Sequence, residues 1–399
     1  MQKTENLEKE ILEIKVLPKL RFREFNDSWN EMKLNDFTKI QRGKFTPRPR
    51  NNPIYYGGNI PFVQTSDVVK SKGKIFKYSQ TLNEKGLKVS KKFKKGTILI
   101  TVAANIGFSG VLEIDVACPD SLIGITCNEH NYNFFLQYLI EIEQPKMDYL
   151  AVAAAQKNIN LEFLYPYKFI LPTLKEQKKI ASFLSVVDEK LQQLTKKKEL
   201  LEGYKKGIMQ KIFSQEIRFK DDNGSVFRNW EEKKLGHICS IIKGKQLNKS
   251  ELTESGLFPA LNGGVNPSGY TDKWNTEKNV ITISEGGNSC GYVNLSKTKF
   301  WCGGHCYSLI GINDNTDFKY LFQILKFLQI KIMKLRVGSG LPNIQMKEIN
   351  KFSVIIPDLK EQVKIANFLS SIDNKIESVS AQIEKTKEFK KGLLQQMFV

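Results

Sequence analysis

Two stretches of the chain, residues 172–213 and 357–399, carry apolar residues at the spacing of a coiled-coil helix. Apolar side chains fill most of the a and d positions of about five heptads in each stretch, a pattern typical of a seam between two paired helices. The seam positions are Ile180, Leu184, Val187, Leu191, Leu194, Lys198, Leu201, Lys205, Ile208 and Ile212 in the first stretch, and Ile365, Leu369, Ile372, Ile376, Val379, Ile383, Thr386, Lys390, Leu393 and Met397 in the second. Pro172 and Pro357 stand at the entries, so each stretch predicts one helix of roughly 40 residues, or about 60 Å.

The two helical stretches are copies of one sequence, because residues 172–213 align without a gap on residues 357–398. The repeat extends upstream, where the matching segments are Asn158-Ile159 with Asn343-Ile344, Ser121–Ile125 with Ser308–Ile312, and Trp29, Leu34 and Gly43-Lys44 with Trp230, Leu235 and Gly244-Lys245. Each copy is a variable region followed by a helix that repeats more closely, with 19 of 42 aligned positions identical. Such an arrangement suits a chain that does one job twice, on two different targets.

Chain order decides how the helices pair. The first helix must deliver the chain to the second variable region and the second is free to run back, so only an antiparallel pair closes both seams within one molecule. Short β-rich runs such as Thr97–Val102 and Val280–Ser284, with amphipathic segments at 133–142 and 318–335, predict an α+β fold for the variable regions. We expect two tandem α/β regions separated by the antiparallel helix pair, with a pseudo-two-fold axis. The expected domains are an N-terminal helical extension at 1–16, a first variable region at 17–171, a first helix at 172–213, a second variable region at 214–356 and a second helix at 357–399.

The charge balance indicates a polyanionic partner. Lys and Arg number 61 against 42 Asp and Glu, a formal net charge of +19, and such an excess favours nucleic acid. The longest uncharged stretch, at 97–112, is too short and too polar to span a bilayer, and the acidic N-terminus does not resemble a secretory signal. Six cysteines in a chain this long do not form a secreted disulfide framework, so the sequence predicts a protein of the reducing cytoplasm.

The best candidates for contacts to a polyanion lie in one loop of each variable region. Residues 41–52 hold four basic side chains and no acidic one, in a proline-broken loop that cannot be a helix interior. Guanidinium groups suit phosphates and guanine, while Asn51, Asn52 and the nearby Gln64 suit adenine. The equivalent residues 243–249 are also basic, and this recurrence weakens the alternative of a merely solvated loop. The candidate DNA-binding residues are Arg42, Lys44, Arg48, Arg50, Asn51 and Asn52 in the first region and Lys243, Lys245, Gln246 and Lys249 in the second.

Few residues offer catalytic or metal chemistry. Cys290, Cys302, His305 and Cys306 could supply four zinc ligands, but their spacing is not that of a zinc knuckle, so buried cysteines are the preferred interpretation. No phosphate-binding glycine loop ends in Lys-Ser or Lys-Thr. Asn52-Pro53-Ile54-Tyr55 resembles the loop with which adenine methyltransferases hold a flipped base, but the glycine-rich nucleotide turn after a strand is missing. We predict no catalytic residue and no metal ligand on this chain.

Taken together, these features resemble the specificity subunit of type I restriction-modification enzymes. The marks are Leu20-Arg21-Phe22, Trp29 and Lys33-Leu34 at the opening of the first region, Ile217-Arg218-Phe219, Trp230 and Lys234-Leu235 at the opening of the second, the Asn-Ile pairs, and two helices that begin Pro-x-Leu-Lys-Glu-Gln. The resemblance implies two target-recognition domains that each read one half of a split, asymmetric DNA site and are held apart by the helices. It implies no particular base contacts, and residues 1–16 depart from the family pattern.

The resemblance also implies partners. Two modification subunits that carry S-adenosylmethionine would dock on the helices, and two ATP-driven and Mg²⁺-dependent restriction subunits would lie outside them. This chain would bind double-stranded DNA and no cofactor, in the cytoplasm. The candidate docking residues are at the repeated helix starts, Leu174, Glu176, Gln177, Leu359, Glu361 and Gln362. Two other functions stay open, a stand-alone DNA adenine methyltransferase that uses residues 52–55 and a non-enzymatic coiled-coil scaffold.

Overall fold

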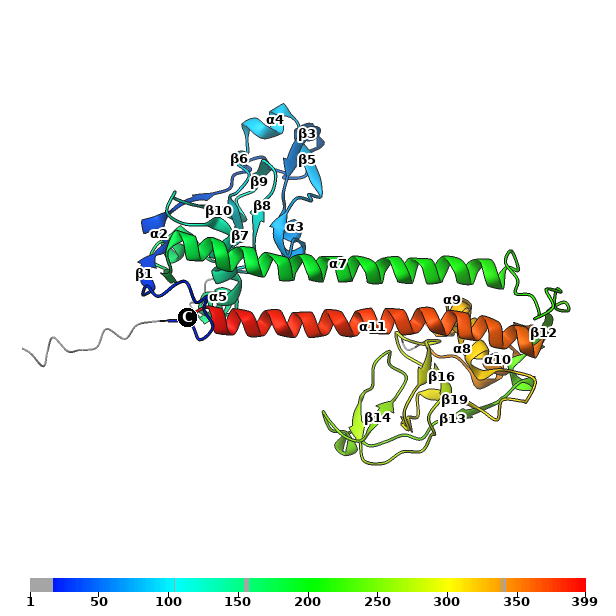
Figure 1. Ribbon diagram of the computed structural model, residues 1–399. Helices are drawn as coiled ribbons and strands as arrows, with labels where there is room; N and C mark the ends of the chain where they lie inside the picture. The colour runs from blue at the N-terminus through cyan, green and yellow to red at the C-terminus, as the bar shows by residue number, and fades with distance from the viewer. Residues whose placement is uncertain (1–16, 104, 154–157, 339, 341) are drawn as a thin grey trace, which may run out of the picture. The chain divides into compact units, whose positions relative to one another are not determined.

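The computed structural model describes residues 17–103, 105–153, 158–338, 340 and 342–399, so the helix predicted at 1–16 lies outside the described residues. The chain divides into two compact units. Unit 1 holds the residues up to Gln193 together with Ile383–Val399, and unit 2 holds Leu194–Gln382. Each unit contains one variable region, the start of one long helix and the end of the other (Figure 1).

The two long helices form where the heptads predict them. Helix α7 spans Leu174–Phe213, and helix α11 spans Leu359–Met397. All predicted seam positions are buried or half-buried. Because each unit joins the start of one helix to the end of the other, the pair is antiparallel, as chain order predicts.

Two lysines that interrupt the predicted seam are paired with acidic residues at repeated positions. In unit 1, Lys390 Nζ lies 2.9 Å from an oxygen of Asp188 and 2.9 Å from an oxygen of Glu141. In unit 2, Lys205 Nζ lies 2.6 Å from an oxygen of Asp373. Polar groups at seam positions specify the register of paired helices. Lys205 and Lys390 therefore fix how α7 and α11 are aligned within each unit.

Unit 1 is built mainly from two sheets and helix α5 (Asn133–Ala153). The larger sheet contains β2 (Thr38–Arg42), β10 (Leu122–Cys127), β7 (Ile98–Thr101), β8 (Ser109–Leu112) and β4 (Gly73–Ile75), in that order, and the smaller contains β5 (Gln80–Leu82), β3 (Tyr56–Phe62), β9 (Val116–Cys118) and β6 (Lys91–Phe93). Successive residues of a strand face opposite sides of a sheet. Ile98 and Ile100 therefore join the core beneath α5, while Leu99 joins a second core on the other face.

Shorter elements close unit 1. Strand β1 (Asn30–Lys33) pairs with β11 (Lys168–Leu171), which leads into α7. The remaining helices are α2 (Leu34–Phe37), η1 (Pro53–Tyr55), α3 (Thr65–Lys70), α4 (Glu84–Lys88) and α6 (Leu161–Leu164).

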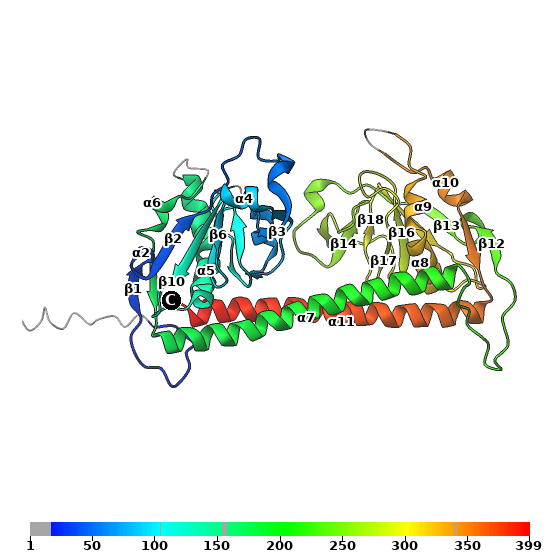
Figure 2. The ribbon, with the colours of Figure 1, turned by 90° about the horizontal axis from the view of Figure 1, so that it is seen from above.

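Unit 2 repeats this frame with a different periphery (Figure 2). Its main sheet contains β13 (Ser240–Lys243), β19 (Cys306–Ile310), β16 (Val280–Ser284) and β17 (Val293–Ser296), a small sheet contains β15 (Gly269–Thr271), β14 (Phe258–Leu261) and β18 (Trp301–Cys302), and β12 (Glu231–Lys234) pairs with β20 (Ser353–Ile356). The helices are η2 (Leu235–His237), η3 (Lys249–Glu251), α8 (Phe318–Phe327), α9 (Gln329–Met333) and α10 (Met346–Lys351). The α+β prediction is confirmed.

Three local predictions need correction. Helix α5 continues past residue 142 and through Pro145, because the buried face that Met147 and Ala151 extend offsets the lost hydrogen bond and the steric clash of an interior proline. The helix predicted at 318–335 breaks between α8 and α9, where the Gln329 side chain accepts a hydrogen bond from Val293 N at 3.0 Å.

The third correction concerns how the two main sheets correspond. The strand ladders place Arg42 opposite Ile123 in unit 1 and Lys243 opposite Tyr307 in unit 2. Ile123 therefore corresponds to Tyr307, not to Ile310 as the sequence match implied. The similarity of two short apolar runs gave the wrong register, because such runs match each other at more than one offset.

Candidate nucleic-acid interface

The basic loops follow equivalent strands, β2 in unit 1 and β13 in unit 2. At the end of each strand a glycine lets the chain pass close to the backbone of another segment. A Cβ on Gly43 would lie 2.1 Å from Pro119 O, and one on Gly244 would lie 2.3 Å from Gly303 O. The next residue then donates its backbone N–H across the crossing, Lys44 to Cys118 O at 3.0 Å and Lys245 to Cys302 O at 2.9 Å. The repeated Gly-Lys pairs thus place their lysines at matching points of the two folds.

In unit 1, one acidic residue organises two of the predicted arginines. Arg42 Nε donates to Asp120 O at 2.7 Å, and Arg50 Nη2 lies 2.8 Å from the Asp120 carboxylate. Arg48 instead donates to Pro47 O at 2.8 Å, and Lys44 is exposed. The Arg50–Asp120 pair is itself exposed, and such pairs are weak, so a phosphate can replace the carboxylate at little cost.

The Asn52–Tyr55 segment has a structural explanation. Asn52 Oδ1 accepts a hydrogen bond from Ile54 N at 3.2 Å and so caps η1. The Tyr55 ring packs edge-on against Phe45, with 6.1 Å between centroids. The resemblance to a methyltransferase loop is therefore accounted for by a turn, whereas Asn51 remains exposed.

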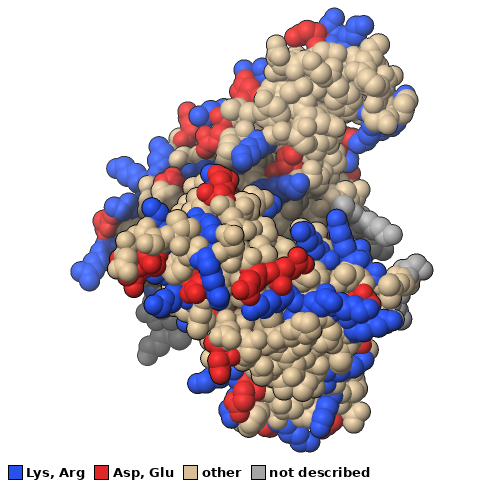
Figure 3. Space-filling model, turned by 90° about the vertical axis from the view of Figure 1, so that its right-hand side faces the viewer, with Lys and Arg blue, Asp and Glu red and all other residues tan. Residues whose placement is uncertain are grey.

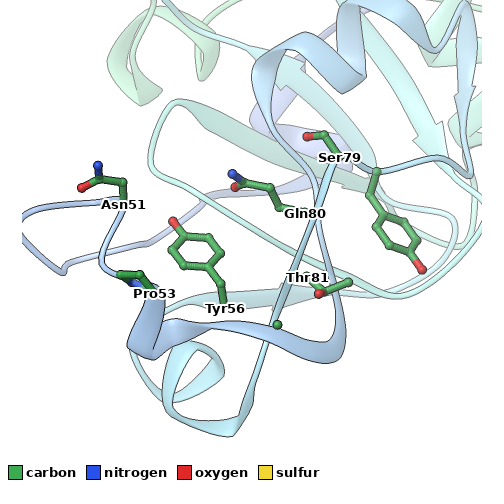
Figure 4. A pocket seen from close by; sticks show the side chains of 8 residues that line it. Asn51, Pro53, Tyr56, Ser79, Gln80 and Thr81 are labelled. Carbon is green, nitrogen blue, oxygen red and sulfur yellow. The ribbon is translucent and has the colours of Figure 1, made fainter.

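A cleft of about 470 Å³ opens beside the basic loop of unit 1 (Figure 4). Its lining contains amide, hydroxyl and aromatic groups and no charged side chain; the residues are Asn51, Pro53, Tyr56, Gly57, Tyr78, Ser79, Gln80 and Thr81. Tyr78 and Gln80 were not predicted from the sequence. They reach the loop only because β5 pairs with β3, which sets Gln80 opposite Phe62.

In unit 2 the predicted basic residues meet carboxylates. Lys243 Nζ lies 2.6 Å from Glu285 Oε1, and Tyr307 donates its hydroxyl to the same oxygen at 3.0 Å. Burial is the main cause that raises the pKa of Tyr307, and this hydrogen bond raises it further. Gln246 Nε2 donates to Leu247 O at 3.1 Å, and Lys249 begins η3. Glu285 was missed because it is far from the loop in sequence.

A second cleft of about 580 Å³ lies along β13 and β19 in unit 2, and its lining includes Lys243, Lys245, Asn275 and Glu277. The acidic group distinguishes it from the cleft of unit 1. On the face in Figure 3, basic side chains are likewise interspersed with acidic ones, so the net charge of the chain does not gather there into one basic patch.

The cysteines are buried or half-buried and free. In the core of unit 2, Cys302 Sγ donates to Cys306 O at 3.6 Å, and its side-chain interaction with Cys306 raises the pKa of Cys302. Among the described residues no group of three or more His, Cys, Asp or Glu could hold a metal ion, which gives the zinc alternative no support. In the same part of the chain, no helix has the length and apolar character needed to cross a membrane.

The structure corrects the prediction that the helix starts face a partner. Glu176 is fully buried and pairs with Arg21 at 2.7 Å. Glu361 is fully buried too; it lies 2.8 Å from Arg218 and accepts a hydrogen bond from Trp230 Nε1 at 2.9 Å.

The neighbouring glutamines are also internal. Gln177 binds Tyr132 N, Asn131 Oδ1 and Pro172 O, each at 2.9 Å, and Gln362 binds Asp317 N, Asn315 O and Pro357 O at 2.9–3.0 Å. These four polar side chains attach the start of each long helix to the unit in which that start lies, because a buried polar group must be hydrogen-bonded within the fold. Leu359 alone of the six predicted docking residues is exposed, and Leu174 is half-buried.

The chain matches the model of the type I restriction modification DNA specificity domain twice, over residues 26–202 and 228–388. A protein of Mycoplasma genitalium, provisionally named a type I specificity subunit, is 33% identical over 172 residues, which make up 43% of this chain and 45% of that protein. The match to this relative thus spans less than half its length. A type I specificity subunit of Methanocaldococcus jannaschii, also provisionally named, is 26% identical over 94% of both chains. The crystal structure of the type I system S subunit from M. genitalium has a similar fold, with a TM-score of 0.70 at 21% identity over 96% of this chain and 99% of that chain.

Proposed function

Because the chain belongs to the type I restriction modification DNA specificity family, we propose that unit 1 reads one half of a split, asymmetric DNA site and unit 2 reads the other. The observation that carries this proposal is the duplicated Gly-Lys crossing, which sets basic side chains at the same strand end of both units. The long helices set the gap between the half-sites and dock two modification subunits, and two restriction subunits complete the complex. S-adenosylmethionine, ATP and Mg²⁺ bind to these partners and not to this chain.

The different chemistry of the two clefts supports an asymmetric site. No charged residue lines the cleft of unit 1, whereas Glu277 lines that of unit 2 and Glu285 pairs with Lys243 nearby. Carboxylates accept hydrogen bonds from cytosine, while neutral amides suit adenine. Two readers of such different composition select different bases.

An exposed aromatic residue at the same position of each long helix supports docking there. Tyr204 on α7 is 55% exposed, and Phe389 on α11 is 56% exposed. Three residues further along stand Gly207 and Gly392, where an added Cβ would meet no atom within 4 Å. Glycine in a helix interior costs about 0.8–1.0 kcal/mol relative to alanine, and no described atom lies close enough to either site to require it. A large apolar side chain beside a bare backbone suits the close approach of another chain.

Exchange of one recognition region tests the proposal. Residues 227–356 are replaced by the equivalent stretch of another family member, the complex is assembled with its modification subunits, and methylated adenines are mapped by sequencing. We expect one half-site to change and the other to stay. Exchange of residues 17–171 is the matched control and should change the opposite half-site. A variant that alters both half-sites, or neither, contradicts independent readers.

A further inference from the structure

We propose that the cleft of unit 1 takes the edge of an adenine base and that Gln80, with Asn51, recognises it. This inference rests on the proposed function and names the base that unit 1 reads. It begins from the lining of the cleft, which offers hydrogen-bonding groups without a formal charge. A phosphate site would place a lysine or arginine in the lining, whereas here the arginines lie beside the cleft and the interior is neutral.

One wall of the cleft is held by a hydrogen bond and by aromatic packing. Tyr56 donates its hydroxyl to Arg50 O at 2.6 Å, and its ring packs on Phe45 and Phe62, with centroids 5.8 and 6.2 Å away. Burial raises the pKa of the Tyr56 phenol, so the ring stays neutral at physiological pH. The hydroxyl that binds Arg50 O also links the cleft to the basic loop, whose arginines are placed to hold the DNA backbone.

The carboxamide of Gln80 is held in place from behind. Gln64 Nε2 donates to Gln80 Oε1 at 2.9 Å. Asp67 Oδ2 accepts from Gln64 N at 2.8 Å and from Ser79 Oγ at 2.9 Å. Asp67 thus links Gln64 to Ser79, the residue that precedes Gln80. Figure 4 shows the Gln80 side chain reaching over the cleft toward Asn51 and the Tyr56 ring. One lone pair of Oε1 and the hydrogens of Nε2 remain available to a ligand.

A carboxamide in this position selects adenine. The major-groove edge of adenine presents a donor at N6 and an acceptor at N7, which match the acceptor and donor of one amide. Guanine presents two acceptors there, so Gln80 Oε1, itself an acceptor, would face guanine O6 with no hydrogen between the two oxygens. Cytosine offers one donor, and thymine offers one acceptor beside a methyl group. Asn51 carries the same pair of groups in the lining of the cleft and can add a second hydrogen bond to the base.

The test uses duplexes that carry 7-deazaadenine, which lacks the N7 acceptor, at each adenine of the first half-site in turn. Binding is measured by fluorescence anisotropy with the assembled complex of this chain and its modification subunits. We expect one position at which the modified base weakens wild-type binding by about 5- to 150-fold. Gln80→Ala should bind the natural site more weakly by a similar factor and should no longer distinguish adenine from 7-deazaadenine at that position.

Two further variants sharpen the result. Gln80→Glu presents only acceptors, so it should shift the preference at this position toward cytosine. Gln345→Ala, which removes an exposed glutamine of unit 2 that lines neither cleft, should leave both half-sites unchanged. Gln80 is itself exposed, so its replacement does not threaten folding.

Each outcome decides the question. If wild-type binding is insensitive to 7-deazaadenine throughout the first half-site, or Gln80→Ala keeps the wild-type sensitivity, the adenine assignment is overturned while sequence-specific binding by the complex still supports the proposed function. If the wild-type complex distinguishes no sequence at all, both are overturned.

Discussion

Replacement of Gly207 and Gly392 by alanine should stabilise the isolated chain and weaken its binding to the modification subunit. Gly207 lies in unit 2 and Gly392 in unit 1, and a Cβ at either site meets open space. Each Gly→Ala change should therefore stabilise the isolated chain by about 0.8–1.0 kcal/mol. For units of this size that gain corresponds to a rise in melting temperature of about 2–4 °C.

Docking should respond in the opposite direction. If a partner backbone lies against the bare helix beside Tyr204 and Phe389, an added methyl group must displace it, and overpacking of this kind costs about 1–3 kcal/mol. The affinity for the modification subunit should then fall by about 5- to 150-fold. Calorimetric melting of the isolated chain and titration with purified modification subunit measure the two effects separately.

Gly203 provides the matched control. A Cβ there also meets nothing within 4 Å, but the equivalent residue of α11 is Glu388, so a side chain at this position is already present on the other helix. Gly203→Ala should stabilise the chain without weakening docking. Unchanged affinity in the double variant Gly207→Ala and Gly392→Ala would refute close approach at these glycines, and a lower melting temperature would refute the helix argument itself.

Four other perturbations address the spacing, the core and the basic loop. Four residues inserted after Thr195 lengthen α7 by about 6 Å, so the gap in the methylated motif should grow by about one to two base pairs; an active variant with the old gap would exclude the helices as spacer. Glu361→Gln leaves the Arg218 guanidinium without the buried negative charge that it faces, and it should cost about 3–5 kcal/mol of unfolding free energy in urea titrations. A loss of about 1 kcal/mol or less, typical of an exposed pair, would contradict this. Burial lowers the pKa of Lys326 from 10.5 to about 8, so the folded chain binds fewer protons between these values and gains stability as the pH rises; Lys326→Met should abolish that rise, and parallel curves for both proteins would count against it. Alanine at all four basic residues of the loop at 41–52 should reduce the slope of log affinity against log salt by about 0.9 per lost phosphate contact. An unchanged slope would show that the loop is solvated and makes no phosphate contact.

Much of the frame could be predicted from the sequence because it depends on local periodicity and on self-similarity. The heptads located α7 and α11, chain order gave their antiparallel pairing, and Val280–Ser284 was predicted as the strand that forms. Lys205 and Lys390 stood out as interruptions of the seam, but their aspartate partners lie on the opposite helix and could not be named from spacing alone.

The sequence by itself determined that this protein is a duplicated pair of basic α+β regions joined to paired helices, and that Gly43 and Gly244 begin equivalent loops. Only the tertiary structure decided which polar groups meet. In the folded chain Glu176 and Glu361, which were predicted to contact a partner, are buried. Gln80 lies beside the loop of unit 1, and Glu285 pairs with a lysine of the loop in unit 2. The reason is that heptad and strand periods repeat over a few neighbouring residues, whereas a hydrogen bond or an ion pair depends on distance in space, which the pairing of remote strands fixes.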